Sequence, residues 1–402
     1  MNRGPTRTRK LYALIAFACV LLIAALILLP RDIPWILPAE HWTADWRTVL
    51  LSDRLTQPPE HPKLAVVLVN DDVLREYGIS DMHHARGLLS KIIAAVDAAH
   101  PSAIGLDFFF LSEPDADTTN TQTLITTIKN ATSPVIVGVA EPPIEMNSNE
   151  RDYQSSFIGQ TNRKAGFVNV RYETGDKVVR FYPGPSTENH ESLDSLLAEA
   201  GGSKPKDAAG QRIPWLLPPR NGLSALLPQR DDDKKAFLTI PAQHLLPPPG
   251  AKDQSSPAST DLKDRIVLIG ADLPRSDKHY TPFSVWTSQK MPGVLIHAHM
   301  TAGLLDQPTR AITELDRHTL RYLLFGIALV GVGVGWYYWQ SLLLGFVSWT
   351  LGLVALIVLD AVMFAAGHVT LPMMQAVVVW FLAVTAGHSI HSVGAKPVEA
   401  GK

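Results

Sequence analysis

The stretch that decides the fold is Asp264–Ser284, DRIVLIGADLPRSDKHYTPFS. Its first half, RIVLIGA, is a short apolar run, which is typical of a strand buried on both faces of a sheet. The loop that follows carries acids, a histidine and hydroxyl side chains. Residues 292–307, PGVLIHAHMTAGLLDQ, then predict a helix, because proline is well suited to the first turn of a helix. A strand, a polar loop and a helix are therefore expected in direct succession.

Earlier segments repeat this alternation. Apolar runs predict buried strands at Lys63–Asp72, Ser102–Leu111 and Ser133–Glu141. Apolar residues at helical spacing predict helices between them, over residues 79–101 and 118–130. Strand–helix–strand order implies right-handed crossovers and a sheet covered by helices. We therefore expect an α/β domain with a mainly parallel sheet.

The middle of this polar region has a different pattern. Lys164–Pro183 contains two strand-like runs around a turn at Thr174–Asp176, which predicts a hairpin. A short helical segment follows, and Gly201 is its natural end. Residues 203–260 are rich in Pro, Gly, Asp and Lys, so we expect a surface insertion there, with one candidate strand in AFLTIPA. The chain has no evident internal repeat.

Long apolar stretches flank the polar region on both sides. They cover residues 11–29, 319–339, 342–366 and 371–391. Each is long enough to cross about 30 Å of hydrocarbon as a helix, which predicts four transmembrane α-helices around a polar domain at 30–318. The first stretch exceeds the usual apolar core of a signal peptide, and no A-x-A-like site follows it. We therefore favour an uncleaved anchor, and its exit, with Trp35 and Trp42, is expected at headgroup depth.

Basic residues predict the orientation of these helices. The first ten residues contain Arg3, Arg7, Arg9 and Lys10 and no acid, so this segment is expected in the cytoplasm. Four crossings return the tail, residues 392–402, to the same side and leave the polar domain outside. The formal net charge of -2 gives no indication of nucleic-acid binding.

Sequence signatures of catalysis are missing. The single cysteine, Cys19, lies in the first apolar stretch, so the polar domain has neither a disulfide nor a thiol nucleophile. The sequence contains no Gly-x-Ser-x-Gly elbow, no phosphate-binding Gly-x4-Gly-Lys loop and no His-Glu-x2-His motif. We therefore expect a protein that is not an enzyme and carries no cofactor.

Three carboxylates belong at or near the ends of predicted strands, namely Asp71, Asp107 and Asp272. In open parallel sheets, ligands bind outside the carboxyl ends of the strands. The interpretation that we favour is that these side chains cap adjacent loops and helices. Ligand binding is the second interpretation, and a catalytic or metal role is the third. Asp107 interrupts an apolar strand, so it must be hydrogen-bonded by loop amides or point into a crevice.

The loop after the last strand combines Asp277 with Thr281 and Pro282. A carboxylate four residues before Thr-Pro can brace a turn by accepting backbone N–H groups, and we favour this role. The functional alternative is that the braced loop roofs a crevice at the strand ends.

Two histidines, His297 and His299, lie in the helix predicted after this loop. Side chains two positions apart on a helix diverge by about 200°, so these rings are not expected to share a metal ion. One of them is expected to pack against the loop near Asp277. His83 and His84 are adjacent at a helix start and are interpreted as solvated. No metal site is predicted.

Asp360 lies within the third apolar stretch, where a carboxylate costs about 2.5–3.5 kcal/mol at mid-bilayer. Arg317 and Arg321 enter the second apolar stretch from the same side. We therefore expect Asp360 to contact Arg321 or Arg317 and to fix helix packing.

These ordered signals resemble the type 2 CHASE domain, an extracellular sensory domain of bacterial cyclases and histidine kinases. The residues that carry the resemblance lie between 63 and 305: VVLVNDDVLREYG, AIGLDFFF with Asp117 and LITTI, AGFVNVRYETGDKVVRFYP, LKDRIVLIGADLPRSDKHYTPFS and PGVLIHAHMTAGLL. The resemblance implies structural roles for Asn169 and Arg180 of the hairpin.

The chain also departs from this family pattern. GISDMHHARG stands where the family has a Trp-Pro-rich stretch, and the hairpin turn is TGDK rather than Asp-Gly. Family members usually carry a cytoplasmic output domain after the third helix, and this sequence stops shortly after that point. A sensor without its own output domain is therefore expected.

Together these features predict a multi-pass sensor of the bacterial inner membrane with a periplasmic domain and cytoplasmic termini. The domain would bind a small molecule or protein, through residues drawn from Asp71, Asp107, Asp272, Asp277, Thr281 and His297. The signal would pass to a separate cytoplasmic or membrane partner. The sequence leaves the oligomeric state open, with a homodimer as one alternative. The alternative function is a structural or assembly subunit of a cell-envelope complex, and a hydrolase is a distant third.

Overall fold

The computed structural model describes residues 5–28, 33–54, 60–114, 118–188, 190–218, 235–247, 260–274, 277–307, 309–338 and 342–394. The chain divides into two compact units. We call Met1–Arg47 with Thr313–Lys402 the helical unit, and Thr48–Ile312 the α/β unit.

A six-stranded sheet organises the α/β unit, and every neighbouring pair of its strands is parallel. In spatial order the strands are β4 (Lys164–Phe167), β3 (Val135–Val139), β2 (Ala103–Asp107), β8 (Ile266–Asp272), β1 (Leu64–Asn70) and β7 (Leu238–Pro241). The predicted α/β fold with a mainly parallel sheet is therefore confirmed. The strand from the decisive stretch, β8, lies in the centre and pairs with both β1 and β2.

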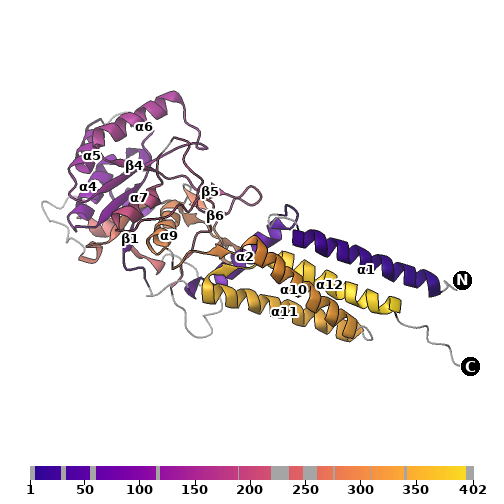
Figure 1. The fold of residues 1–402 in the computed structure, drawn as a ribbon. Coiled ribbons are helices and arrows are strands. Elements are labelled where there is room, and N and C mark those ends of the chain that lie inside the picture. Colours follow the sequence, from indigo (N-terminus) through magenta and orange to yellow (C-terminus); the bar gives the residue numbers. More distant parts are fainter. Residues whose placement is uncertain are drawn as a thin grey trace, which may run out of the picture. The chain divides into compact units, whose positions relative to one another are not determined.

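Helices cover both faces of this sheet, which explains why its central strands are apolar along their whole length. One face packs against α4 (Arg86–Asp97), α5 (Thr118–Asn130) and α6 (Ser148–Thr161) (Figure 1). The other face packs against α7 (Leu193–Ala200) and α9 (Gly293–Leu305).

Two glycines permit the close approach of α7 and α9 to the sheet. A Cβ on Gly270 of β8 would lie 2.4 Å from the Cβ of Val294 on α9. A Cβ on Gly105 of β2 would lie 2.6 Å from a methyl group of Leu197 on α7. Both distances are too short for a real side chain, so these two glycines let the helices lie directly on the strands.

The hairpin predicted over Lys164–Pro183 is only partly correct. Its first run forms β4, which joins the edge of the main sheet, and the hairpin consists of the shorter β5 (Arg171–Tyr172) and β6 (Val179–Phe181). Pairing with β3 buries Gly166 and Phe167, whereas an isolated two-stranded hairpin is marginally stable in water. The first run is therefore more stable in the main sheet.

Two of the longer helices, α6 and α2 (Leu37–Leu51), were not predicted from the sequence. α6 follows a capping box in which Asn147 and Glu150 bond each other's backbone N–H groups, and this signal is visible in the sequence. α2 contains Trp42, in a segment expected as a simple exit from the membrane. Parts of the predicted insertion, residues 219–234 and 248–259, and also Asp117, lie outside the described residues.

The described chain also contains shorter helices and strands. They are α3 (Asp71–Glu76), α8 (Ser284–Thr287), β9 (Lys278–His279) paired with β10 (Met291–Pro292), and, in the helical unit, β11 (Thr313–Glu314) paired with β12 (Val369–Thr370).

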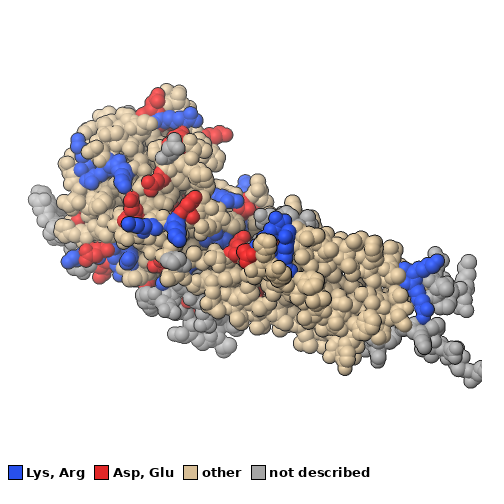
Figure 2. All heavy atoms as spheres, in the orientation of Figure 1, with Lys and Arg blue, Asp and Glu red and all other residues tan. Residues whose placement is uncertain are grey.

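Four helices among the described residues are long and apolar enough to cross a membrane. They are α1 (Pro5–Leu28), α10 (Arg317–Tyr337), α11 (Leu342–Gly367) and α12 (Met373–Gly394), as the sequence predicts. On the face drawn in Figure 2, the middle of the helical unit shows neither blue nor red side chains. The start of α1 and the end of α12 lie at the same end of this unit (Figure 1).

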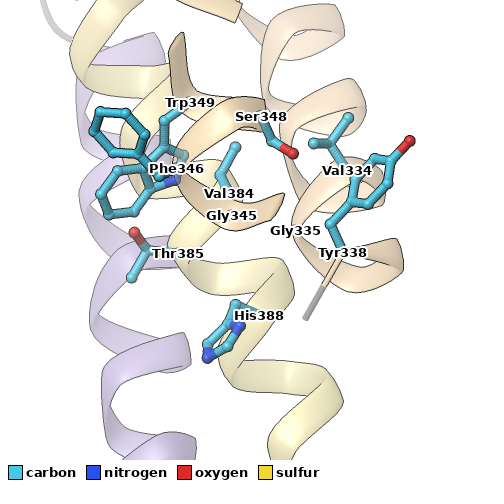
Figure 3. Close-up of a pocket in the computed structure, with 10 residues that line it drawn as sticks. All are labelled: Val334, Gly335, Tyr338, Gly345, Phe346, Ser348, Trp349, Val384, Thr385 and His388. Carbon is cyan, nitrogen blue, oxygen red and sulfur yellow. The ribbon is translucent and has the colours of Figure 1, made fainter. Parts of the chain in front are cut away.

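A cavity of about 280 Å³ lies between α10, α11 and α12 (Figure 3). Apolar and aromatic side chains such as Val334, Phe346 and Trp349 form most of its wall. The hydroxyl groups of Ser348 and Thr385 donate to carbonyl groups of their own helices. The wall therefore offers mainly apolar contacts.

The expected contact of Asp360 with Arg321 or Arg317 is wrong. Asp360 accepts hydrogen bonds from Arg47 of α2 at 2.6 and 2.8 Å, and both side chains are buried. Arg317 and Arg321 instead each donate to the carbonyl group of Leu28, at 3.4 Å. The expectation was wrong because α2, which was not predicted, brings Arg47 closer to Asp360 than either of the other two arginines.

Further hydrogen bonds hold α2 within the helical unit. The backbone N–H of Gln375 on α12 donates to Glu40 of α2 at 2.7 Å, and the side chain of Gln375 donates to the carbonyl group of Leu26 at 2.7 Å. The backbone N–H of Leu371 donates to Asp360 at 3.1 Å. The Arg47–Asp360 pair therefore belongs to a hydrogen-bonded cluster that joins α1, α2, α11 and α12.

Replacing Asp360 with Asn should lower the free energy of unfolding by about 3 kcal/mol, because a buried guanidinium loses its counter-charge. Thermal unfolding of the detergent-solubilised chain measures this change. Arg321→Gln is the matched control and should have a much smaller effect. The double variant Arg47→Met, Asp360→Leu should be more stable than Asp360→Asn, since no charge is left unpaired. Equal losses for Asp360→Asn and Arg321→Gln would contradict the assignment.

Candidate functional site

A buried histidine, His297 of α9, lies between two carboxylates at the carboxyl edge of the sheet. Its Nδ1–H donates to Asp194 of α7 at 3.0 Å, and its Nε2–H donates to the carbonyl oxygen of Val168 at 3.2 Å. The same Nε2 lies 3.7 Å from Asp107 at the end of β2. α9 is buried on all sides, so its polar side chains must find partners inside the protein.

The two neighbouring carboxylates decide the charge of this histidine. Burial alone would lower the pKa of His297, but the negative charges of Asp194 and Asp107, with the hydrogen bond to Asp194, raise it to about 10. His297 is therefore an imidazolium at neutral pH. Burial raises the pKa of Asp107 to about 7, although the positive charge of His297 opposes the rise. The His297 imidazolium is thus the shared counter-charge of Asp194 and Asp107, and only Asp194 is hydrogen-bonded to it.

Asp107 is the less satisfied of these two acids. Its Oδ2 atom is buried and has no hydrogen-bond partner among the described residues. Of the two surroundings expected for this carboxylate, loop amides or a crevice, no loop amide among the described residues donates to this atom. Asp194 receives a further hydrogen bond from Thr301, one turn after His297 on α9, at 3.2 Å.

A second set of polar contacts joins Asp277, whose carboxylate is influenced by the charge of His297, to the hairpin. Nε2–H of His279 on β9 donates to Asp277 at 2.7 Å, and Nδ1 of the same ring shares a hydrogen bond with the hydroxyl group of Tyr172 on β5. Burial would raise the pKa of Asp277, but the hydrogen bond and charge of His279 and the charge of His297 lower it. Asp277 therefore stays ionised. It interacts with the charge of His297 and, through His279, is connected to Tyr172.

Asp277 does not brace the Thr-Pro turn as expected. Its carboxylate binds His279, and its backbone carbonyl accepts from Gly293 at 2.9 Å. The turn is instead held by Ser284, whose hydroxyl oxygen accepts from the backbone N–H of Thr281 at 3.0 Å. Thr281 is buried in this turn.

The remaining predicted ligand residues lie apart from the His297 cluster. Asp71 is exposed in the first turn of α3. Asp272 is at the end of β8 and forms an ion pair with Lys278 at 2.9 Å. The structure thus brings together Asp107, Asp277 and His297 from the predicted set, and adds Asp194, which the sequence analysis missed. Asp194 carried no signal beyond an acid in the first turn of a predicted helix.

His299 lies in surroundings opposite to those of His297. Its ring packs against Trp215 and Phe237, with centroids 5.1 and 4.9 Å away, and its Nδ1 accepts from the backbone N–H of Leu216 at 3.1 Å. Burial lowers the pKa of His299 to about 3, so this ring is neutral. One helix therefore carries a charged and a neutral histidine two residues apart.

Asn169 and Arg180 fix the segments around the hairpin. The Asn169 amide donates to the carbonyl groups of Glu141 and Pro142, at 2.6 and 3.0 Å, and its oxygen accepts from the Glu141 N–H at 3.2 Å. Arg180 is buried and donates to both carboxylate oxygens of Asp176, at 3.0 and 2.6 Å.

A cavity of about 350 Å³ opens beside these residues, at the carboxyl ends of β3 and β4. Its polar wall includes Glu141, Asn169, Arg171, Tyr172 and Ser186. Glu141 is almost fully buried, accepts from the Ser186 hydroxyl at 2.6 Å and also accepts a hydrogen bond from the ring of His190. Glu141 was considered only as the end of a predicted strand, and its role depends on long-range folding.

The cavity and the His297 cluster share one segment of chain. Val168 accepts the hydrogen bond from His297, and the next residues, Asn169–Tyr172, line the cavity. Tyr172 also joins the wall of the cavity to Asp277 through His279. A molecule in the cavity would therefore contact the same backbone that holds α9.

Comparison with known proteins identifies a family. The family model described as the CHASE2 domain matches residues 18–334, which is more than half of the chain. No curated protein and no solved structure matches the chain.

The free energy of unfolding should fall as the pH rises from about 7 towards 10. The folded-state pKa of His297, about 10, lies above that of an unfolded histidine, about 6.5, so its stabilising contribution is complete below pH 6.5 and is lost through pH 10. Unfolding of the intact solubilised chain across this range measures the slope. His297→Gln should flatten it.

Asp107→Asn is the control for this slope. Between about pH 4 and pH 7, Asp107 is protonated in the folded state but ionised in the unfolded state, because its folded pKa is about 7. Its contribution to the loss of stability with rising pH therefore lies in this lower range. The variant should keep most of the decline above pH 7, because Asp194 still raises the pKa of His297, and should reduce the decline below pH 7. A His297→Gln slope parallel to that of the unmodified chain would contradict the charge assigned to His297.

Proposed function

The chain belongs to the CHASE2 domain family, and on that premise we propose that it is an integral membrane sensor whose α/β unit binds a small molecule and changes the arrangement of the membrane helices. CHASE2 domains are extracellular sensory domains associated with signalling proteins.

The observation that carries the proposal is the 350 Å³ cavity at the carboxyl ends of β3 and β4. Ligands of open parallel sheets bind at this edge. The cavity wall offers a buried carboxylate, an amide, a guanidinium and a phenol, from Glu141, Asn169, Arg171 and Tyr172. This mixture of charges suits a small polar molecule better than an apolar one.

The His297 cluster connects the cavity wall to α9, the last helix of the α/β unit. α9 ends at Leu305, shortly before the chain enters the helical unit at Thr313. A ligand that moves Asn169–Tyr172 would alter the hydrogen bond from His297 to Val168 and the contact between Tyr172 and His279. Signalling requires that the ligand binds one of the two arrangements more tightly than the other.

The proposed orientation places the α/β unit in the periplasm and both termini in the cytoplasm of a bacterial inner membrane. Arg9 and Lys10 at the start of α1, with the even number of crossings, support this orientation. The signal is proposed to pass to a separate partner, and the site to bind its ligand without catalysis.

A thermal-shift screen tests the sensory function. The purified intact chain in nanodiscs is mixed with amino acids, sugars and small carboxylates, and a true ligand at 100 times its Kd should stabilise the protein by about 2.7 kcal/mol. Arg171→Ala should abolish this shift. Lys164→Ala is the control, since this exposed lysine pairs with Glu199 outside the cavity wall.

The outcomes also separate the sensor from an assembly subunit. No stabilising compound in the panel, together with a pull-down that recovers structural components of the envelope, would favour the assembly subunit. A shift that persists in Arg171→Ala would contradict the assignment of the cavity.

A thiol-labelling experiment tests the orientation. In a Cys19→Ser background, Lys129→Cys on α5 should react with a membrane-impermeant maleimide in cells whose outer membrane is permeabilised. Thr8→Cys at the start of α1 should react only after lysis. The reverse pattern would place the α/β unit in the cytoplasm.

A further inference from the structure

Three potential metal ligands converge beside the cavity of the α/β unit. Glu141, Glu188 and His190 each offer one ligand atom, and these atoms all lie within 4.8 Å of one another. Glu141 follows β3, whereas Glu188 and His190 belong to the segment before α7. The sequence pattern predicts no metal site here, because the residues come from distant parts of the chain.

The charge balance at Glu141 is the first argument for a bound cation. Its side chain is 2% exposed, and no lysine or arginine among the described residues forms an ion pair with it. Its partners are the neutral hydroxyl group of Ser186 and the imidazole of His190. Buried carboxylates are ordinarily paired with a cation or coordinated to a metal. Because His190 is a cation only when it is protonated, a metal ion would supply Glu141 with a permanent positive charge.

The exposure of the other two ligands is the second argument. The side chain of His190 is 39% exposed, and Glu188 is exposed. The cluster therefore has one fixed ligand at its base and two ligands that an ion can reach from solvent. The 350 Å³ cavity, which Glu141 and Ser186 also line, leaves room for water or a small molecule on the ion.

The kinds of ligand indicate the class of metal. Two carboxylates and one imidazole provide oxygen and nitrogen donors, which suit divalent first-row transition metals. Mg²⁺ and Ca²⁺ prefer oxygen ligands alone. Three protein ligands with a remaining open position are the usual arrangement for Zn²⁺ that binds an exchangeable molecule.

We propose that Glu141, Glu188 and His190 bind one divalent transition-metal ion, with Zn²⁺ as the expected ion, at the rim of this cavity. Glu141 lines the cavity together with Asn169 and Arg171, so an ion on this cluster would bind a carboxylate or another anionic group of a ligand there. The ion site itself does not depend on the proposed sensory function. The ligand class that it would select deepens that function and rests on it.

Isothermal titration calorimetry tests the metal site on the intact chain in nanodiscs, purified without a polyhistidine tag and stripped with a chelator. We expect Zn²⁺ to bind at one ion per chain, and Mg²⁺ and Ca²⁺ to bind far more weakly. Glu188→Gln and His190→Ala should weaken Zn²⁺ binding by at least about tenfold. Both residues are at least partly exposed, so these variants should fold, which their melting temperatures in chelator verify.

Glu145→Gln is the matched control, because Glu145 is an exposed acid near Glu141 that lies outside the cluster. It should bind Zn²⁺ like the unmodified chain. No Zn²⁺ binding by the unmodified chain, or equal binding by Glu188→Gln and His190→Ala, would overturn the site. One bound Zn²⁺ with no stabilising compound in the screen would retain the metal site and count against the sensor.

Discussion

The buried ion pair between His297 and Asp194 is the interaction on which the α/β unit depends. It joins α9 to α7, and through Val168 it also joins α9 to the end of β4. Buried charges are tolerated only when they are paired and hydrogen-bonded, so these segments must meet in one arrangement. The cluster therefore fixes the carboxyl edge of the sheet, where the cavity opens. Through these hydrogen bonds, α9 is also attached to that edge.

The same physical rule governs the helical unit. Asp360 is an acid within an apolar helix, and it is buried against Arg47. Sequence reasoning correctly required a basic partner for this carboxylate and chose the wrong arginine. α2 is short and only weakly amphipathic in its pattern, so its return to the membrane helices is not visible locally. Which of several arginines reaches a carboxylate is decided by the path of the chain in space.

The proposed sensor and the proposed metal site draw on one feature of the fold. The parallel sheet brings the ends of β2, β3 and β4 to a single edge, and polar side chains that are far apart in sequence meet there. Glu141 remains buried beside His190, while Asp107 remains partly unsatisfied beside His297. These two acids lie at or just after the ends of neighbouring strands, β2 and β3, so occupancy of the cavity and the charge of the His297 cluster are expected to be coupled.

The sequence by itself determined the elements whose signal is local. Continuous apolar runs gave β1, β2, β3 and β8, and apolar length gave the four membrane helices, because burial in a sheet or in lipid requires a particular composition. Only the tertiary structure decided the partners: Asp194 for His297, Arg47 for Asp360, and His190 with Ser186 for Glu141. No local pattern records these pairings, because each joins segments that meet only after the chain has folded.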